Sequence, residues 1–275
     1  MLDLHLHSLV SDGTEAPRVV VERAAKRGVS TLALTDHDTI GGVEEAMATG
    51  RELGVDVWTG IEISATDDER RSVHVLGYGF ELDDLGLREA LTRLVDRRDD
   101  RNEQIVTRLR ALGMSIDLDE VRKKAQGTVG RPHLARALIE AGFVKSFEEA
   151  FDRWLGEGRR AYVPRPMIDP RGAVEVLHRA GGLASLAHPV TLARDPIRSE
   201  ALIRKAESEG FDAIEVNHPS QSPGERNMLR WFASRYGLLL TGGSDQHGPE
   251  DPIEAAPDEW LGPLVDRLRA VRRSH

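Results

Sequence analysis

Cysteine is absent from this chain of 275 residues. Disulfide bonds and thiolate metal sites are therefore excluded, and any bound metal must be held by histidine, aspartate and glutamate. Nitrogen and oxygen ligands of this kind favour hard or borderline ions.

Long apolar runs are absent as well. No stretch approaches the roughly 18 consecutive apolar residues that a membrane-spanning helix needs. The opening MLDLHLH has neither the basic segment nor the apolar core of a secretion signal. We therefore expect a soluble, cytoplasmic protein that has no membrane partner.

Basic residues are fewer than acidic residues, so the net charge is −9 and the isoelectric point is about 5.6. This balance argues against general electrostatic binding of long DNA or RNA. Charge is distributed unevenly along the chain, because residues 88–136 contain 12 Lys or Arg and only 8 Asp or Glu. That segment could face an anionic substrate, or it could be an ordinary solvated helix face.

Strand-like apolar runs alternate with helical patterns along most of the chain. This alternation predicts an α/β fold with a largely parallel sheet, either open or closed into a barrel. In such sheets functional residues gather at the carboxyl ends of the strands. The expected strands cover residues 2–7, 31–35, 55–63, 73–79, 183–187, 213–217 and 238–242.

The alternation stops over residues 83–160, where the pattern is helical throughout. We expect a long charged helix over residues 85–112, followed by helices in RPHLARALIEAG and SFEEAFDRWLGEG. Ser146 and Glu149 form a capping-box pattern at the start of the last of these. We therefore expect an all-helical inserted domain at 98–162, between two parts of the α/β domain at 1–97 and 163–275.

Two histidines alternate with leucines in the opening stretch DLHLHS. Residues i and i+2 of a strand project to the same side, so His5 and His7 face the same way. Two adjacent imidazoles repel each other when protonated and gain most from a shared cation. The pair therefore favours a metal site.

Further histidines and acids fall at the ends of the expected strands or close to them. They are Asp12 in SDGT, His37 in TDHD, Glu62 in GIEIS, His74 in VHVLGY, His188 in LAHP, and Asp245 with His247 in GGSDQHG. Asp12 could be only a turn residue and Asp38 only a helix cap. Glu62 is harder to dismiss, because a carboxylate between two isoleucines needs a partner charge. His218 in EVNHPSQSP is an open candidate.

Taken together, these motifs resemble the polymerase and histidinol phosphatase (PHP) family of phosphoesterases. The matching stretches stand in the family's order: DLHLHS with SDGT, ALTDHDT, GIEIS, VHVLGY, LAHP and GGSDQHG. The inserted helices, which contain VGRPHLARAL, further resemble the TrpH-like branch. That branch acts on nucleoside 3′,5′-bisphosphates or on RNA 5′ ends.

The resemblance implies a distorted (β/α)7 barrel, the PHP fold, with three divalent metal ions at its carboxyl-end face. The ions would be Mn, Fe or Zn, which this ligand chemistry does not separate. By resemblance the first ion is held by His5, His7, Glu62 and Asp245, the second by Glu62, His74 and His188, and the third by Asp12, His37 and His247. A water that bridges two such ions would lose its proton and attack phosphorus.

Substrate contacts are also implied by the resemblance, which assigns Arg131 and His133 of GRPH to the substrate phosphate. Gly130, Arg131 and Pro132 independently resemble a helix start, whose free N–H groups favour an anion. An arginine there could equally be a surface charge. Some relatives have a histidine where Gln221 stands, so the acid that protonates the leaving group stays unassigned, with His218 as a candidate substitute.

We expect a metal-dependent phosphomonoesterase that acts on a small nucleotide, either a nucleoside monophosphate or a 3′,5′-bisphosphate. A 5′–3′ exoribonuclease on short RNA is the main alternative, and the inserted helices disfavour a histidinol phosphate phosphatase. An amidohydrolase also begins with His-x-His, but it normally needs a carboxylated lysine or an equivalent carboxylate at mid-barrel. A metal- or nucleotide-binding regulatory module is the non-enzyme alternative.

Overall fold

The computed structural model describes residues 1–125, 129–164, 167–251 and 258–273. Its strands are β1 (Leu2–Leu6), β2 (Thr31–Leu34), β3 (Asp56–Trp58), β4 (Gly60–Thr66), β5 (Ser72–Tyr78), β6 (Leu183–Leu186), β7 (Ala213–Asn217) and β8 (Leu239–Gly242). Its α-helices are α1 (Pro17–Lys26), α2 (Val43–Leu53), α3 (Leu85–Ala111), α4 (Leu118–Ala125), α5 (Arg131–Glu140), α6 (Phe147–Ala150), α7 (Pro170–Arg179), α8 (Pro196–Ser208), α9 (Pro223–Tyr236) and α10 (Asp258–Arg273). A π-helical turn, Phe151–Leu155, continues α6, and a 3-10 turn, Pro189–Thr191, follows β6.

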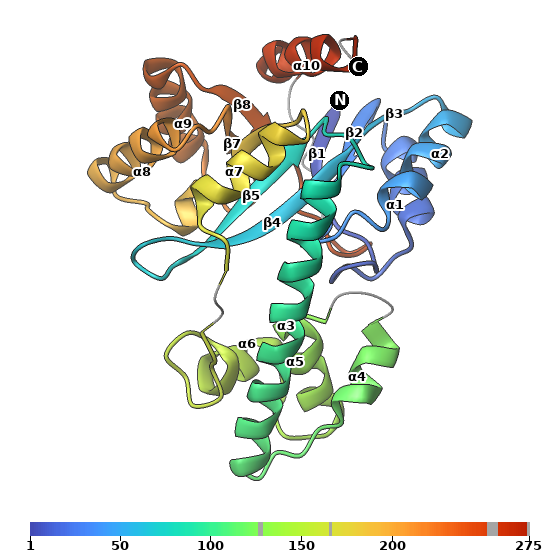
Figure 1. Ribbon diagram of the computed structural model, residues 1–275, viewed down its shortest axis with the longest axis vertical. Coiled ribbons are helices and arrows are strands. Elements are labelled where there is room, and N and C mark those ends of the chain that lie inside the picture. The colour runs from blue at the N-terminus through green and yellow to red at the C-terminus, as the bar shows by residue number, and fades with distance from the viewer. Residues whose placement is uncertain (126–128, 165–166, 252–257, 274–275) are drawn as a thin grey trace.

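The described strands form two sheets, in the orders β1-β2-β3 and β4-β5-β6-β7-β8. All pairs are parallel except those of β5, which runs antiparallel to both β4 and β6. Isolated bridges join the sheets, one between Leu6 and Gln246 and one between His37 and Glu62. The architecture is therefore mixed α/β, with the two sheets joined by these two bridges and flanked by helices (Figure 1).

One expectation from the sequence is wrong in detail. The strand expected over residues 55–63 is broken at Thr59 into β3 and β4, which belong to different sheets. Gly60 allows this crossing, because a Cβ there would lie only 2.5 Å from the carbonyl oxygen of Leu34. The sheets are largely parallel, as expected, apart from the pairs of β5 with β4 and β6. Only a short turn joins β4 to β5, and a parallel crossover needs about a dozen residues or more.

Helix α3 runs past the sheets into a separate helical layer made by α4, α5 and α6 (Figure 1). Leu87 and Leu94 in its first half belong to the core under α7, α8 and α9. Ile105 and Leu109 in its second half belong to a second core, formed by residues 105–163. Between these apolar halves lie buried polar residues, including Arg98. The helix therefore links two cores and carries charge at the junction between them.

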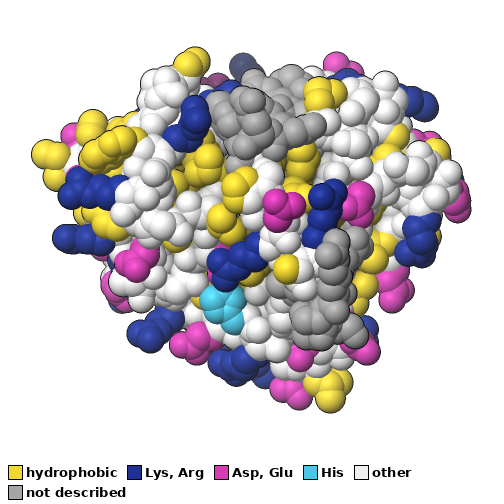
Figure 2. All heavy atoms as spheres, turned by 90° about the horizontal axis from the view of Figure 1, so that it is seen from above, with side chains coloured by type: hydrophobic (Ala, Val, Ile, Leu, Met, Phe, Trp, Pro, Cys, Tyr) yellow, Lys and Arg dark blue, Asp and Glu magenta, His cyan; other side chains and the backbone are white. Residues whose placement is uncertain are grey.

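Helix α10 covers the end of the sheets where β1 begins (Figure 1). Its Leu261, Leu264 and Leu268 pack in one core with Leu2 and Trp58. On the face seen in Figure 2, acidic and basic side chains are interspersed among the atoms drawn in colour. None of the described helices is both long and apolar enough to cross a membrane.

Candidate metal centre

The site lies at the end of the sheets opposite α10, where the carboxyl ends of the parallel strands point toward the helical layer (Figure 1). His5 lies in β1 and His37 follows β2, while Asp245 follows β8. Strand β5 contributes from its first half, because it runs in the opposite direction and pairs His74 with Ser64 of β4. Antiparallel pairing thus brings an early residue of one strand to the same edge as the late residues of the others.

One group of side chains surrounds the two histidines of the opening motif. The Nε2 atom of His5 lies 3.4 Å from Oε2 of Glu62 and 3.2 Å from Oδ1 of Asp245. The Nε2 atom of His7 lies 3.3 Å and 3.1 Å from the same two oxygens. Each of the four side chains offers an atom within 4.8 Å of the others, as a shared cation requires.

A second group surrounds Asp12, in the loop that follows β1. Its carboxylate oxygens lie 3.7 Å from Nε2 of His37, 3.4 Å from Nε2 of His247 and 3.7 Å from Nδ1 of His7. These four side chains also fall within the range of one ion. His7 therefore belongs to both groups. Its Nε2 atom faces the first group, and its Nδ1 atom faces the second.

Glu62 stands between all of these side chains. Its Oε1 lies 2.8 Å from Nδ1 of His74 and 3.2 Å from Nε2 of His188. Its Oε2 lies 3.1 Å from Nδ1 of His37, in addition to the contacts with the opening histidines. A single buried carboxylate therefore touches five imidazoles, which is the position of a ligand shared between ions.

The electrostatics of the site favour ionised carboxylates. Burial alone would raise the pKa of Glu62, but His37, His74 and His5 hold it well below its ordinary value. Burial is likewise outweighed at Asp245, where His5, His218 and His7 lower the pKa. Buried carboxylates that stay ionised are suitable ligands for divalent cations.

Several ring nitrogens in the site are buried and lack a hydrogen-bond partner among the described residues. They are Nε2 of His5, Nδ1 and Nε2 of His7, and Nδ1 of His37. Buried polar atoms are normally hydrogen-bonded, so such a set needs another kind of partner. Neutral imidazole nitrogens and carboxylate oxygens without any thiolate fit divalent Mn, Fe or Zn.

Close backbone packing joins the first strand to the loop after β8. Asp245 donates its N–H to the carbonyl of His5 at 2.8 Å, and Asp3 accepts from the N–H of Ser244 at 2.9 Å. A Cβ at Gly243 would lie 2.3 Å from the backbone nitrogen of His5. The glycine in GGSDQHG is therefore needed to bring Asp245 against the opening strand.

The two aspartates of TDHD have supporting roles. Asp36 accepts from the N–H and hydroxyl of Ser8, at 2.8 Å and 2.7 Å, and thereby holds the loop that carries Asp12. Asp38 accepts from the N–H of Ser64 at 2.7 Å and pairs with Arg98 of α3. The alternative in which Asp38 is only a helix cap is wrong, because α2 begins at Val43 after Gly42.

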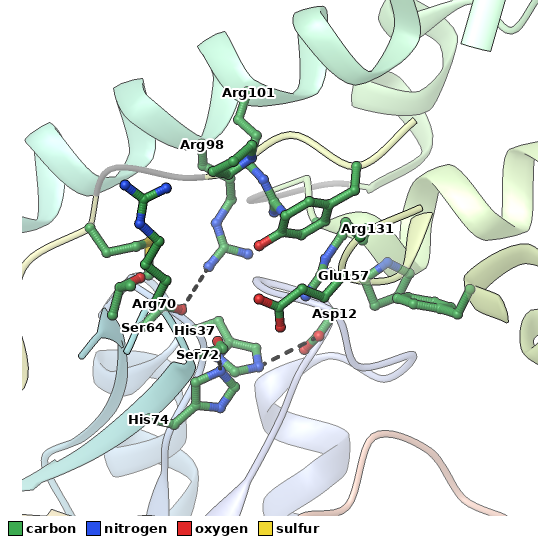
Figure 3. Close-up of a pocket in the computed structure, with 18 residues that line it drawn as sticks. Asp12, His37, Ser64, Arg70, Ser72, His74, Arg98, Arg101, Arg131 and Glu157 are labelled. Carbon is green, nitrogen blue, oxygen red and sulfur yellow. Dashed lines mark hydrogen bonds and ion pairs between the residues drawn. The ribbon is translucent and has the colours of Figure 1, made fainter. Parts of the chain in front are cut away.

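A pocket of about 850 Å³ separates this cluster from the helical layer (Figure 3). Asp12, His37 and His74 line its floor, and Arg131 lies on the opposite wall. The guanidinium of Arg131 lies 5.7 Å from the ring centroid of Phe151 and 5.9 Å from that of Tyr162. It donates to the carbonyl of Leu155 at 3.3 Å and makes no ion pair with a described residue. Burial, together with repulsion from Arg98, lowers its pKa, so an anion in the pocket would stabilise it.

The other two candidate substrate contacts lie elsewhere. His133 accepts the N–H of Gly130 on its Nδ1 at 3.0 Å, and its side chain lines a smaller cavity between α4 and α5. His218 is buried beside the cluster, with Nε2 3.1 Å from Oδ2 of Asp245. Gln221 donates to the carbonyl of Glu215 at 3.2 Å and is buried. None of the three lines the large pocket.

Glu215 is a site residue that the sequence reasoning missed. It is fully buried, accepts from Nδ1 of His5 at 2.9 Å and from the N–H of His188 at 2.7 Å. A carboxylate in this position fixes which nitrogen of His5 carries the proton and leaves Nε2 free for a metal. The signal was present, because Glu215 lies between Ile214 and Val216 just as Glu62 lies between two isoleucines.

Comparisons with known proteins point to one family. A family model described as the PHP domain matches residues 3–106. A 5′-3′ exoribonuclease of Haemophilus influenzae is 36% identical over 269 residues, which cover 98% of this chain and 96% of that protein. A 3′,5′-nucleoside bisphosphate phosphatase of Chromobacterium violaceum is 34% identical over 266 residues, 96% of this chain and 93% of that one. A crystal structure from Bifidobacterium adolescentis, described as a metal-dependent phosphoesterase, superimposes with a TM-score of 0.86 at 32% identity, covering 97% of this chain and 96% of that chain.

Proposed function

Since the chain belongs to the PHP family and is a metal-dependent hydrolase of phosphate esters, we propose that its substrates are phosphate monoesters of small nucleotides. Nucleoside monophosphates and 3′,5′-bisphosphates are the proposed members of this class. Most of the chain also matches the Chromobacterium violaceum enzyme, whose name states a 3′,5′-nucleoside bisphosphate as its substrate.

The observation that carries this proposal is the position of Arg131. Its half-buried guanidinium faces the pocket above the histidine and carboxylate cluster and has no carboxylate partner among the described residues. Arginine forms strong, charge-assisted hydrogen bonds with phosphate oxygens. Phe151 and Tyr162 restrict the side chain on both sides. Arg131 is therefore proposed to hold the phosphate group over the cluster.

Nine residues are proposed as ligands of three divalent ions. They are His5, His7, Asp12, His37, Glu62, His74, His188, Asp245 and His247. Divalent ions bound there would supply Lewis acidity and lower the pKa of bound water. The protein's own part is to hold the imidazoles in the right tautomer, as Glu215 does for His5, and to keep water and phosphate in line over the cluster.

The placement of His133 and His218 leads to narrower proposals for each. His218 contacts Asp245 and lies in a possible ligand group with His5 and Glu215, so it is proposed to support the metal centre. His133 is proposed to act through the start of α5, because its Nδ1 accepts the N–H of Gly130. It would thereby orient Arg131, two residues before it.

The architecture is proposed to be a distorted (β/α)7 barrel with a helical insertion at 98–162, which divides the barrel into parts at 1–97 and 163–275. The bridges at Leu6 and Glu62 support closure, because one links β1 to the loop after β8 and the other links the segment after β2 to β4. The separate core of residues 105–163 supports the insertion. Helix α3 begins before residue 98, so it would extend from one unit into the other.

Exonucleolytic cleavage of short RNA from its 5′ end is the second candidate. The Haemophilus influenzae relative, which this chain matches over 98% of its length, is named for that activity. The same cluster could cut a phosphodiester in place of a monoester, because both reactions displace an oxygen at phosphorus. The inserted helices, with Arg98, Arg101 and Arg131 facing the pocket, would suit an RNA backbone.

A panel assay distinguishes these candidates. Phosphate release is measured from AMP, adenosine 3′,5′-bisphosphate and histidinol phosphate, and mononucleotide release from 5′-phosphorylated oligoribonucleotides, with manganese and with chelator. Small nucleotides should be hydrolysed fastest, and only with metal. Mononucleotide release from the oligoribonucleotides at a much higher rate would favour the exonuclease. Release from histidinol phosphate alone would overturn both.

A further inference from the structure

A second arginine, Arg70, lines the same pocket from the tip of the β4–β5 hairpin. Its side chain is exposed and makes no ion pair or side-chain hydrogen bond with a described residue. In Figure 3 it lies on the opposite side of the pocket from Arg131, with Arg98 between them and with His37 and His74 below in this view. The pocket is therefore lined by one arginine of the hairpin, Arg70, and by arginines of α3 and α5 on the other side: Arg98, Arg101 and Arg131.

The hairpin turn holds Arg70 in an unusual backbone conformation. Asp67 accepts the N–H groups of Glu69 and Arg71 at 3.0 Å and 2.8 Å, and it pairs with the Arg71 guanidinium at 2.7 Å. Arg70 donates its own N–H to the carbonyl of Asp67 at 2.9 Å. The result is a φ of 64° at Arg70, in the left-handed region that disfavours residues with a Cβ.

The two neighbouring arginines thus have different surroundings. Arg71 is neutralised by Asp67 and by Glu69, whose carboxylate lies 3.3 Å away. Arg70 faces a wall that also carries the hydroxyl groups of Thr66 and Ser72. Guanidinium and hydroxyl groups are the hydrogen-bond donors that proteins use for phosphate. A non-glycine residue held at positive φ beside an active site is a candidate for function.

We propose that Arg70 binds a second phosphate of the substrate, one that is not cleaved, and thereby selects bisphosphorylated over monophosphorylated nucleotides. The inference rests on the proposed function, because it takes the first phosphate to lie over the metal cluster near Arg131. The other charged groups of the pocket fit this division. Glu157 lies on the Arg131 side (Figure 3), Arg98 is paired with Asp38, and Arg101 donates from Nε to the carbonyl of Val163 at 2.7 Å.

The test compares kcat/KM for adenosine 3′,5′-bisphosphate, 5′-AMP and 3′-AMP in the wild type, Arg70→Gly and Arg70→Lys. Glycine suits the backbone conformation at this position, so Arg70→Gly removes the guanidinium without adding strain. We expect Arg70→Gly to lower kcat/KM for the bisphosphate about tenfold, mainly by raising KM. For either monophosphate, kcat/KM should change less than twofold. Arg70→Lys should retain part of the preference.

Control variants separate this effect from general charge and from the first phosphate site. Arg51→Ala removes an exposed arginine from α2, away from the pocket, and should leave kcat/KM for all three substrates unchanged. Arg131→Ala should lower kcat/KM for all three substrates by the same factor. An equal loss on all substrates in Arg70→Gly, or no loss on any, would overturn the role of Arg70.

A binding measurement tests the Arg70 site independently of the proposed hydrolysis. The dissociation constants of adenosine 3′,5′-bisphosphate and 5′-AMP are measured by calorimetry with the metal-free protein. The wild type should bind the bisphosphate more tightly than AMP, and Arg70→Gly should lose about tenfold of that difference. If no nucleotide is hydrolysed but this difference persists, the proposed function fails and the Arg70 site stands. If nucleotides are hydrolysed without any such difference, the Arg70 site fails alone.

Discussion

Individual residues of the site divide into those whose role the sequence indicated and those whose role depends on the fold. Alternation in DLHLHS placed two imidazoles on one strand face, and the structure brings both against Glu62 and Asp245. His133 is different, because nothing in GRPH shows that its Nδ1 is already used by Gly130. This local hydrogen bond occupies the ring nitrogen that a substrate contact would need, and the sequence motif does not show that the bond forms.

Arg131 should contribute chiefly to substrate binding. A lost charge-assisted contact of about 1.5 to 3 kcal/mol predicts that Arg131→Ala raises KM by about tenfold or more. Steady-state kinetics on the best nucleotide of the panel checks this, with Arg131→Lys as the variant that keeps the charge but not the planar fork. Unchanged kinetics in Arg131→Ala would remove the residue from the phosphate site.

His133 should make stability depend on pH. Burial lowers its pKa, with Arg136 and Arg98 adding repulsion, so the folded protein favours the neutral ring. The stability from this group is therefore present above the unfolded pKa of about 6.5 and is lost as pH falls through the lower folded pKa. Protonation also removes the acceptor for Gly130 N–H, a cap worth about 1 kcal/mol.

The matched variant for this prediction is His133→Gln, whose amide can accept the same hydrogen bond and does not titrate. Urea denaturation at several pH values between 5 and 8 gives the free energy of unfolding for both proteins. The wild type should lose about 1 kcal/mol relative to His133→Gln between pH 7 and pH 5. Parallel pH profiles would show that His133 does not titrate in this way.

Among the elements, the periodic helices were predictable and the strand directions were less so. The long helix expected over residues 85–112 is α3, and the glycine-arginine-proline start is the start of α5. The break between β3 and β4 has no such signal, because Thr59 stands inside an apolar run that reads as one strand. The antiparallel direction of β5 could have been inferred from the short connection after β4.

The junction of α3 with the strands depends on one buried ion pair. Arg98→Met leaves the Asp38 carboxylate buried among Ser64 and the strands without its cation, so it should lower the free energy of unfolding by about 3 kcal/mol. Chemical denaturation measures the loss. The double variant Arg98→Met with Asp38→Asn should recover part of it, and a single variant as stable as the wild type would contradict the prediction.

For the molecule as a whole, the site is the point where most of the chain's histidines meet a few buried carboxylates. Ions bound to the folded protein alone stabilise it by mass action. Manganese should therefore raise the midpoint of thermal unfolding, and chelator should remove the increase. Glu62→Gln should reduce the shift more than His247→Gln, because Glu62 touches five imidazoles and His247 contacts only the group around Asp12 and the edge of Asp245. Equal shifts in both variants would argue against a shared central ligand.

The hydrogen bonds between the first strand and the loop after β8 have a consequence for how the protein is made. His5 and His7 are synthesised some 240 residues before Asp245 and His247. A nascent polypeptide can assemble β1, β2 and β3, but four of the proposed ligands cannot meet until the segment after β8 has been synthesised. Metal loading should therefore follow synthesis of the segment after β8, and chains that terminate before residue 243 should bind manganese far more weakly than the 275-residue chain.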